Sequence, residues 1–344
     1  MHIKVGIIGC GSIARLRHAP EYKSNPYVSE IVFFDRNPER AEGLAKMFGG
    51  SVATTVDELL DDPTIQIISD CSSNEFHHIF STKSLEAGKH VLCEKPISLS
   101  IEFANKIVQA QKKSGKKLMV DHNQRFTQAH MKAKEMLENE ELGKVLTFRT
   151  TFGHAGPEHW GVNKTNSTWF FKHNRSALGV GGDLGIHKID LVQYLLGDEI
   201  EQVSAFQGAL DKVDENGKPI EVCDNIVCSL KTKRGYIGTA SFSWTYYGEE
   251  DNSTIFYCEK GIMKIYHSDE YQIEVITKDG ERVKYQIECI QTNDHQTSSG
   301  VIDAFVESVR LDKEPLVSGE DALSSLKVIL AILKAAETNT VVTI

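Results

Sequence analysis

The residues best suited to chemistry form two short clusters, and the first of them follows an apolar run. Lys95 comes directly after the run His90–Cys93, in the segment Glu94-Lys95-Pro96. If that run is a strand of a parallel sheet, Lys95 lies at the carboxyl edge, where ligands bind in open α/β folds. An ammonium group there could stabilise negative charge on a reacting oxygen. Most lysines, by contrast, are simply solvated surface residues.

The second cluster combines carboxylates with an imidazole. Asp183, His187 and Asp190 are spaced at i, i+4 and i+7, which places them on one face of a helix that begins near Asp183. A carboxylate one turn from an imidazole can fix its tautomer and raise its basicity, as a general base requires. Asp183 could instead cap the helix while His187 packs in the core. A metal site made of these three residues lacks an obvious further ligand, so we expect no metal.

A third pattern is typical of dinucleotide binding. The turn Gly9-Cys10-Gly11-Ser12-Ile13-Ala14 follows the first apolar run and precedes a helical stretch. Gly9 permits the tight turn, Gly11 lets backbone N–H groups approach a pyrophosphate, and Ala14 lets helix and strand pack closely. The N-terminus of the following helix adds partial positive charge. The turn therefore predicts a phosphate-binding loop.

The next strand supplies a candidate for cofactor selection. Asp35 ends that strand 24 residues after Gly11, where a ribose-binding acid is expected. Its carboxylate would accept hydrogen bonds from the adenosine 2′-OH and repel a 2′-phosphate. We therefore expect NAD, although the adjacent Arg36 leaves NADP open.

The elements that position these residues alternate in type up to residue 121. Short, nearly all-apolar runs predict buried strands at Ile3–Ile8, Glu30–Phe34, Ile65–Asp70, His90–Cys93 and Lys117–Val120. Amphipathic stretches between them predict helices, among them Pro38–Phe48, Phe76–Ala87 and Ile101–Ser114. Strands separated by helices build a parallel sheet covered on both faces. We therefore expect an α/β, doubly wound Rossmann domain over residues 1–121.

After residue 121 the strands show period-two alternation and Gly-containing turns, which is typical of antiparallel sheets. Such runs occur at Val145–Phe152, Val203–Leu210, Asn225–Lys231, Gly235–Trp244, Ser253–Tyr257, Met263–Tyr266, Gln272–Thr277 and Arg282–Ile287. Helices are expected at Thr127–Glu138, Asp183–Leu196, Gly300–Leu311 and Glu320–Glu337. We expect an α+β domain over residues 122–344 with a large, mostly antiparallel sheet. One helix layer covers only one face, so the other face predicts a homo-oligomer formed through this sheet.

Bulk properties narrow the classes of partner. The formal net charge of -10 argues against nucleic acid, whose phosphates require a basic face. No apolar stretch approaches the ~18–20 residues of a membrane span. We therefore expect a cytoplasmic protein that binds neither nucleic acid nor membrane.

These motifs together resemble the glucose–fructose oxidoreductase / inositol dehydrogenase / rhizopine-catabolism family (Gfo/Idh/MocA), over essentially the whole chain. Beyond the clusters above, the resemblance rests on Ser72-Ser73-Asn74 with His77, Asn123-Gln124-Arg125-Phe126, Trp169 and Pro315-Leu316-Val317-Ser318-Gly319-Glu320-Asp321. Two segments depart from the family pattern. Ser72-Ser73-Asn74 stands where Thr-Pro-Asn is frequent, and Ala177-Leu178-Gly179 replaces a triple glycine.

The resemblance implies roles for individual residues. The family's catalytic residues correspond to Lys95, Asp183 and His187. Contacts to the cofactor are expected from Gly9, Gly11, Ser12, Ile13, Asp35, Arg36, Ser72, Asn74, His77, Glu94 and Lys95. Contacts to a small polyhydroxylated substrate are expected from Lys95, Arg125, His154, Trp169, Asp183 and His187.

The expected reaction is hydride transfer between a nicotinamide cofactor and a secondary alcohol carbon of a sugar, a cyclitol or a sugar derivative. His187 would take the hydroxyl proton, Asp183 would orient the imidazole and Lys95 would stabilise the reacting oxygen. The alternative is a catalytically inactive regulator or sensor that keeps the cofactor-binding fold. The presence of all three residues favours the enzyme.

Overall fold

The computed structural model describes residues 2–160, 164–287 and 298–344. Contacts divide the chain into one unit of residues 1–123 with 291–323 and a second unit of residues 124–290 with 324–344. Within the described residues, no helix is long and apolar enough to cross a membrane.

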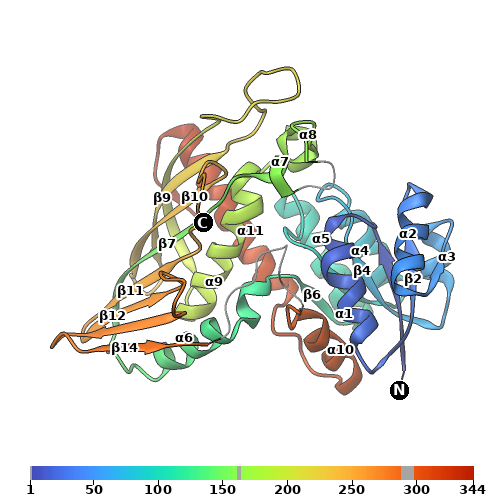
Figure 1. Cartoon of the computed structure of the whole chain (residues 1–344), viewed down its shortest axis with the longest axis horizontal. Helices are drawn as coiled ribbons and strands as arrows, with labels where there is room; N and C mark the ends of the chain where they lie inside the picture. Colours follow the sequence, from blue (N-terminus) through green and yellow to red (C-terminus); the bar gives the residue numbers. More distant parts are fainter. Residues whose placement is uncertain (1, 161–163, 288–297) are drawn as a thin grey trace. The chain divides into compact units, whose positions relative to one another are not determined.

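The first unit is built on a parallel sheet of six strands in the order β3-β2-β1-β4-β5-β6 (Figure 1). This is the strand order of a Rossmann fold. The strands are β1 (Ile3–Ile8), β2 (Val28–Phe34), β3 (Ser51–Val52), β4 (Ile65–Asp70), β5 (His90–Cys93) and β6 (Leu118–Val120). The helices are η1 (Ala14–His18), α1 (Ala19–Ser24), α2 (Pro38–Phe48), α3 (Val56–Asp61), α4 (His77–Glu86), α5 (Ile101–Ser114) and α10 (Val301–Leu311).

The register of these strands aligns their carboxyl ends. Ile8 pairs with Asp70, and Asp70 pairs with Cys93. The ladder continues one residue past each strand, because the amide of Cys71 donates to Ile8 O at 2.8 Å and that of Glu94 donates to Asp70 O at 3.0 Å. The segments that follow β1, β4 and β5 therefore lie next to one another at one edge of the sheet.

The C-terminal part of the chain is divided differently from the expected single domain over residues 122–344. Contacts place α10 with the first unit. Its apolar side is buried through Val301, Ile302 and Phe305. Polar contacts add to this packing, since Asn25 Nδ2 donates to Asp303 Oδ1 at 2.6 Å. An amphipathic helix is held wherever its apolar side is covered, which periodicity alone does not specify.

The second unit contains a mixed sheet of nine strands in the order β14-β13-β12-β11-β7-β10-β9-β8-β15. The pairing of β10 with β7 is parallel, and the other pairings are antiparallel. The strands are β7 (Val145–Gly153), β8 (Ile200–Gly208), β9 (Asn225–Thr232), β10 (Ile237–Ser243), β11 (Thr254–Cys258), β12 (Gly261–Ile265), β13 (Ile273–Thr277), β14 (Arg282–Tyr285) and β15 (Val342–Thr343). The fold therefore matches the expected pair of a parallel Rossmann sheet and a mostly antiparallel sheet.

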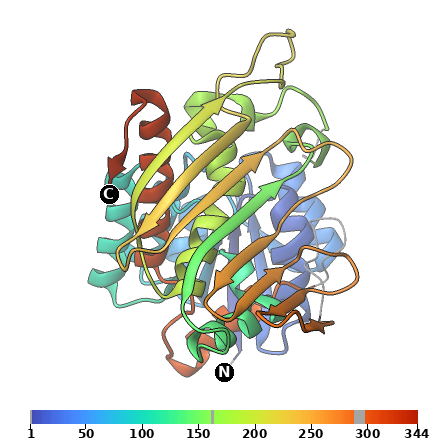
Figure 2. The same ribbon diagram turned by 90° about the vertical axis from the view of Figure 1, so that its left-hand side faces the viewer.

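Helices of the second unit pack on one face of this sheet. The helical elements that begin in this unit are α6 (Gln128–Glu138), α7 (Pro157–Trp160), η3 (Trp169–Phe171), α8 (His173–Ser176), η4 (Gly181–Gly185) and α9 (Ile186–Leu196). A longer helix, α11 (Gly319–Thr338), begins in the first unit and continues into the second. Contacts join α6 to β12, α9 to β7 and η4 to β10. Figure 2 shows the opposite face of the sheet toward the viewer, with the helices behind it.

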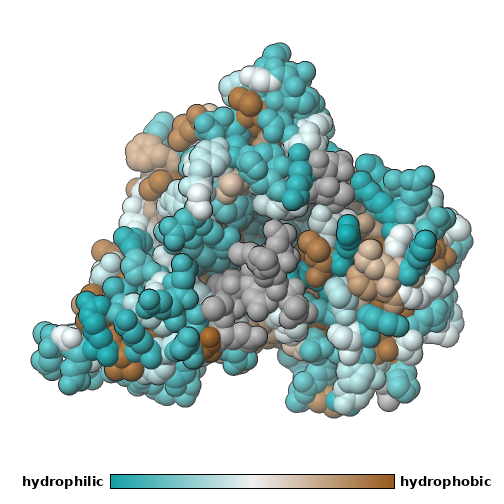
Figure 3. Space-filling model, viewed as in Figure 1, coloured by the Kyte–Doolittle hydropathy of each residue, from teal (hydrophilic) through white to brown (hydrophobic). Residues whose placement is uncertain are grey.

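The uncovered face carries exposed apolar side chains on the neighbouring strands β8, β9 and β10. Phe206 pairs with Val227 across β8 and β9, and the exposed fractions of these residues are 78% and 58%. Ile237 on β10 is 57% exposed. In the view of Figure 3, in contrast, described residues present a mainly hydrophilic surface over which apolar residues are scattered. These exposed apolar side chains lie on the outer face beside polar neighbours such as Ser229, Lys231 and Thr239.

A buried ion pair anchors α9 in the second unit. Nε and Nη2 of Arg125 donate to the two carboxylate oxygens of Asp190, each at 2.7 Å. Arg125 is 5% exposed and Asp190 1% exposed, so both charges are removed from water. The guanidinium also lies 4.9 Å from the ring centre of Tyr194. A bidentate pair of this kind compensates the cost of burying each charge.

We predict that Asp190→Ala destabilises the protein by about 3–5 kcal/mol, because it leaves the Arg125 charge buried without its carboxylate. Replacing both partners, as in Arg125→Met with Asp190→Leu, should recover most of that loss. Urea unfolding followed by circular dichroism measures both changes. Glu102→Ala removes an exposed partner of Lys106 and should leave the free energy of unfolding nearly unchanged. A similarly small cost for Asp190→Ala would contradict the prediction.

Candidate functional site

The glycine turn after β1 combines a strained backbone with open space. Gly9 has φ of +92°, and a Cβ at this position would lie 2.6 Å from the carbonyl oxygen of Cys71. A Cβ at Gly11 would have no atom within 4 Å. The next turn begins with the amide of Arg15 donating to Gly11 O at 3.1 Å, and it passes into the π-helical segment η1. The first glycine is therefore required by the fold, whereas the second leaves room for a ligand.

Asp35 lies next to this turn. Its Oδ2 accepts from the amide of Cys10 at 2.8 Å, and its Oδ1 accepts from the amide of Asn37 at 2.8 Å. The carboxylate thereby joins the glycine turn to the start of α2. Each oxygen has further lone pairs, and Asp35 is only half-buried while Arg36 is exposed. The carboxylate is held in place and remains able to accept hydrogen bonds from a ribose.

These features fit a dinucleotide. The space at Gly11 lets a phosphate approach the backbone, and the amides of Ser12 and Ile13 lie at the first turn of the following helix. Asp35 stands at the expected distance along the chain for a ribose-binding acid. The sequence motif and its local geometry therefore agree.

The segment after β4 is organised around two buried groups. Asp70 Oδ1 accepts from the Ser72 hydroxyl at 2.6 Å, and Asp70 Oδ2 accepts from the Ser81 hydroxyl at 2.7 Å. His77 is fully buried; its Nδ1 lies 2.8 Å from Pro96 O and its Nε2 lies 3.0 Å from Ser72 O. Asn74 is buried as well. Both ring nitrogens of His77 thus contact backbone carbonyls, which leaves neither for the expected contact to a cofactor.

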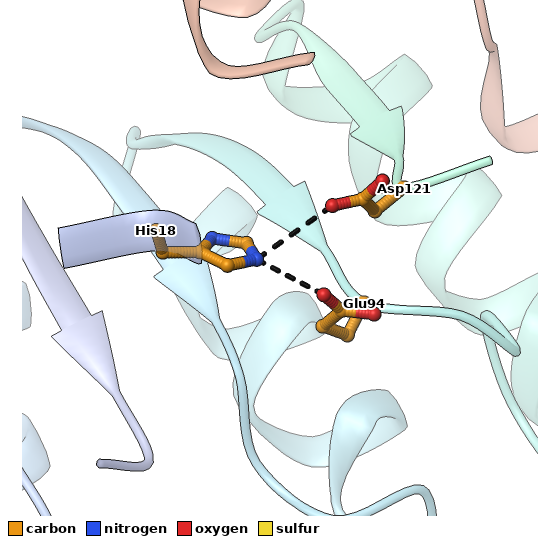
Figure 4. A group of neighbouring side chains, drawn as sticks. All are labelled: His18, Glu94 and Asp121. Atoms are coloured by element: carbon orange, nitrogen blue, oxygen red, sulfur yellow. Dashed lines mark hydrogen bonds and ion pairs between the residues drawn. The ribbon is translucent and has the colours of Figure 1, made fainter. Parts of the chain in front are cut away.

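Glu94 belongs to a buried cluster with two residues that the sequence patterns did not single out, His18 and Asp121 (Figure 4). Glu94 Oε1 lies 3.0 Å from His18 Nε2, and Glu94 Oε2 accepts from the amide of Lys95 at 3.1 Å. Asp121 Oδ2 lies 3.7 Å from the same His18 nitrogen. Glu94 is therefore bound to the protein on both oxygens, and the cofactor contact expected of it has to compete with these bonds.

Burial and charge determine the ionisation of this cluster. Burial alone would lower the pKa of His18, but the neighbouring Cys71 and Glu94 outweigh it and raise that pKa. Burial and the nearby Glu94 raise the pKa of Asp121 to about 8. Burial raises the pKa of Glu94, but the hydrogen bond from His18 more than offsets it, and the resulting pKa is lowered. These shifts favour a His18–Glu94 ion pair and the protonated form of Asp121.

Among the described residues, this cluster is the one group of three potential metal ligands, with donor atoms within 4.8 Å of one another. The direct contact between His18 and Glu94 makes it an ion pair as it stands. Two local signals could have pointed to its members. His18 follows Ala14 by four residues in the turn after the glycines, and Asp121 directly follows β6.

In the second unit, Asp183 and His187 lie on consecutive turns. Asp183 is inside the π-helical segment η4, whose N-cap is Val180, so it does not cap the helix. Asp183 Oδ2 accepts from Trp244 Nε1 at 3.0 Å, and both residues are buried. The partly exposed ring of His187 lies 6.1 Å from that of Phe152. The π-turn is a local departure from the regular helix that periodicity predicts, and such turns are frequent at functional sites.

The segment after β7 contributes aromatic rings to the same unit. His154 makes an edge contact with Trp160 at 6.4 Å, and Trp160 makes one with Phe170 at 5.0 Å. Phe170 in turn stacks on Trp169 at 3.9 Å and meets the edge of Trp244 at 6.4 Å. The expected substrate residues His154 and Trp169 therefore belong to one aromatic group with the partner of Asp183. Arg125, also expected at the substrate, is instead buried against Asp190.

Comparison with known families matches both units. Residues 3–122 match the model described as "Oxidoreductase family, NAD-binding Rossmann fold". Residues 130–264 match the model described as "GFO/IDH/MocA C-terminal domain". The two matches follow one another along the chain.

Relatives similar to this chain cover most or nearly all of its length. The chain is 27% identical to the myo-inositol 2-dehydrogenase of Thermotoga maritima over 97% of this chain and 96% of the relative. It is 27% identical to the levoglucosan dehydrogenase of Pseudarthrobacter phenanthrenivorans over 74% of this chain and 70% of the relative. A solved levoglucosan dehydrogenase in complex with NADH and levoglucosan has the same fold, with a TM-score of 0.88, 22% identity and coverage of 100% and 99% of the two chains. The chain therefore belongs to the Gfo/Idh/MocA family of NAD-binding oxidoreductases.

Proposed function

We propose that this oxidoreductase transfers hydride between NAD and a secondary alcohol carbon of a sugar, a cyclitol or a related polyhydroxylated ring. The observation that carries the proposal is the buried bond from Trp244 to Asp183, which holds a carboxylate one turn from His187. The relatives named as dehydrogenases of myo-inositol and levoglucosan support this substrate class.

In this proposal each side chain has one task. His187 removes the proton of the substrate hydroxyl, and Asp183 orients the imidazole and stabilises its protonated form. Lys95 donates a hydrogen bond to the reacting oxygen and stabilises its developing negative charge. Bound NAD supplies the hydride acceptor. Trp244 fixes one oxygen of Asp183, which restricts the orientations open to the carboxylate.

The aromatic group of the second unit supports a ring-shaped substrate. Sugars and cyclitols present hydroxyls at their rims and C–H bonds on their faces. Trp169 and Trp160 offer flat apolar surfaces, while His154 and His187 offer ring nitrogens. Such a mixture of aromatic surface and a few polar groups is typical of sites for small polar rings.

We predict that Lys95→Ala lowers kcat by a factor on the order of 10²–10³ with little change in NAD affinity, because the lost charge acts on the transition state. His187→Ala should lose a factor on the order of 10²–10⁴, partly recovered at high pH, where less proton abstraction by the enzyme is needed. Steady-state kinetics on a panel of inositols, aldoses and anhydrosugars, with fluorescence titration of NADH, measures both.

Lys106→Ala is the matched control, because Lys106 is an exposed lysine of the same unit that pairs with Glu102. It should leave kcat unchanged. Near-wild-type turnover of Lys95→Ala would reject the assignment of Lys95. Absence of NAD reduction by wild type across the whole panel would favour the inactive regulator.

A second prediction separates fold from cofactor binding within the glycine turn. Gly11→Ala should leave the melting temperature unchanged, because its Cβ meets no protein atom, yet weaken NAD binding by about tenfold, or 1.4 kcal/mol. Gly9→Ala should lower stability by about 1–3 kcal/mol, because its φ is positive and its Cβ meets the Cys71 carbonyl. Differential scanning fluorimetry and isothermal titration with NAD distinguish the two. Equal NAD affinity in Gly11→Ala and wild type would argue against phosphate binding at this turn.

We also propose that the chain forms a homodimer or homotetramer through the outer face of the nine-stranded sheet. The exposed apolar residues Phe206 and Val227 lie on one side of Ser204, Ser229 and Thr239, and Ile237 lies on the other side. The three smaller residues line a shallow depression together with Ile237. Apolar residues gathered on an open sheet face are typical of an interface between subunits.

Phe206→Glu should therefore shift the protein to monomer, because a carboxylate would lose its water in the interface. Light scattering coupled to size exclusion at micromolar concentration reports the mass. Met47→Glu introduces the same charge at a 56% exposed position on α2 and should leave the mass unchanged. A wild-type monomer would refute the proposal outright.

A further inference from the structure

Two buried histidines contact the residues on either side of Lys95. His18 Nε2 lies 3.0 Å from Glu94 Oε1, and His77 Nδ1 lies 2.8 Å from Pro96 O. The exposed fractions of both histidines are 0%. Lys95 itself is partly exposed, whereas Glu94 and Pro96 are buried. The lysine is therefore the accessible residue of a segment held on both sides from within the unit.

The contacts of His77 determine its protonation state. A neutral imidazole has one N–H donor and one acceptor nitrogen. The partners of His77 are the carbonyl oxygens of Pro96 and Ser72, and both can only accept. Satisfying both bonds requires two N–H donors, so His77 is an imidazolium that bridges the segments after β4 and β5.

The surroundings of His77 agree with this charge. Burial by itself lowers the pKa of His77, but Cys93, Asp70 and the Pro96 carbonyl raise it to about 10. The charged and titratable groups that face it are Asp70 on β4, Cys93 on β5, Glu94 and the adjacent His78. A histidine whose pKa is raised on folding contributes stability that is full below about pH 6.5 and is lost as the pH rises through about 10.

His18 holds the other side through the Glu94 side chain. Its Nδ1 lies 2.7 Å from Ser69 Oγ, which also accepts from the Tyr22 hydroxyl at 3.3 Å. The second oxygen of Glu94 accepts from the amide of Lys95 at 3.1 Å. A hydrogen-bonded path of two steps thus joins the His18 ring to the backbone of Lys95.

We propose that His18 and His77 are positioning residues for Lys95, which act by fixing Glu94 and Pro96 so that the lysine leaves the sheet edge in one direction. The inference rests on the proposed function only for the expected effect on kcat. It assigns His77 and Glu94 to the support of Lys95, in place of the contacts to cofactor that the family resemblance suggests. Placement within a fraction of an ångström matters because a shift of about 1 Å can cost on the order of a hundredfold in rate.

The first test is spectroscopic and needs no substrate. Nitrogen-15 NMR of the full-length protein with NAD, labelled at histidine, reports whether each ring nitrogen carries a proton. At pH 8 we expect a doubly protonated ring that disappears from the spectrum in His77→Gln. A neutral ring at His77 would overturn the bridge between the two carbonyls.

The second test compares variants of His77. His77→Phe removes both hydrogen bonds, whereas His77→Gln retains N–H donors and should recover part of the effect. We expect kcat to fall on the order of tenfold to a hundredfold in His77→Phe, with NAD affinity nearly unchanged. The control is His90→Phe, because His90 lies on β5 itself and bonds the amide of Lys117 instead. If His77→Phe fails to fold, His77→Gln is compared with that control. A lower kcat in His77→Gln supports the positioning role, and an equal kcat contradicts it.

Acylation of Lys95 separates failure of this inference from failure of the proposed function. The rate at which an amine-selective reagent modifies Lys95, followed by mass spectrometry, depends on how the lysine is held and on no catalytic step. A changed rate in His18→Gln and His77→Gln, with an unchanged rate in His90→Phe, supports the inference. If the acylation rate changes while kcat does not, the positioning role is supported and the catalytic role of Lys95 is rejected. An unchanged acylation rate in both variants would overturn the positioning itself.

Discussion

Parallel strands end at the same edge of a sheet, and the register of β1, β4, β5 and β6 decides which residues meet there. The strands β4, β5 and β6 are each followed by an amide that donates to the last carbonyl of the neighbouring strand. These amides belong to Cys71, Glu94 and Asp121, and the bonds are 2.8–3.0 Å long. These bonds bring the glycine turn, the Ser72 segment, Glu94 and Asp121 into one row. A slip of the register by one residue would turn every side chain to the opposite face of the sheet. The whole cofactor-binding edge depends on this pairing.

Placing charged groups at such an edge requires that they be neutralised inside the protein. The unit does so with the His18–Glu94 ion pair, with the attraction between His77 and the nearby Asp70, and with a raised pKa of Asp121 that favours its neutral form. An unpaired buried charge would cost several kcal/mol. The same interactions that compensate burial hold the backbone on both sides of Lys95. Stability and orientation of this segment are consequently properties of one hydrogen-bonded network.

The second unit differs from the first because helices cover only one face of its sheet. That face positions Asp183 and His187, because η4 packs against β10 and brings Asp183 to Trp244. The ion pair of Arg125 with Asp190 anchors the following helix α9 two turns further along the chain. The opposite face retains Phe206, Val227 and Ile237 at the surface. The two faces of this sheet therefore carry different side chains, and the alternation of side chains along each strand keeps them separate.

The sequence by itself determined the order of strands and helices, the glycine turn with Asp35, the Glu94-Lys95-Pro96 segment and the Asp183–His187 spacing. These follow from local periodicity and turn chemistry, which neighbouring residues decide among themselves. The tertiary structure alone decided the partners: His18 meets Glu94 across 76 residues, Trp244 meets Asp183 across 61, and Arg125 turns to Asp190 across 65. It also placed α10 with the first unit and introduced the π-turn at Asp183. Such contacts depend on strand register and helix packing. The sequence alone therefore does not decide whether a given histidine, arginine or aspartate binds a ligand or stabilises the fold.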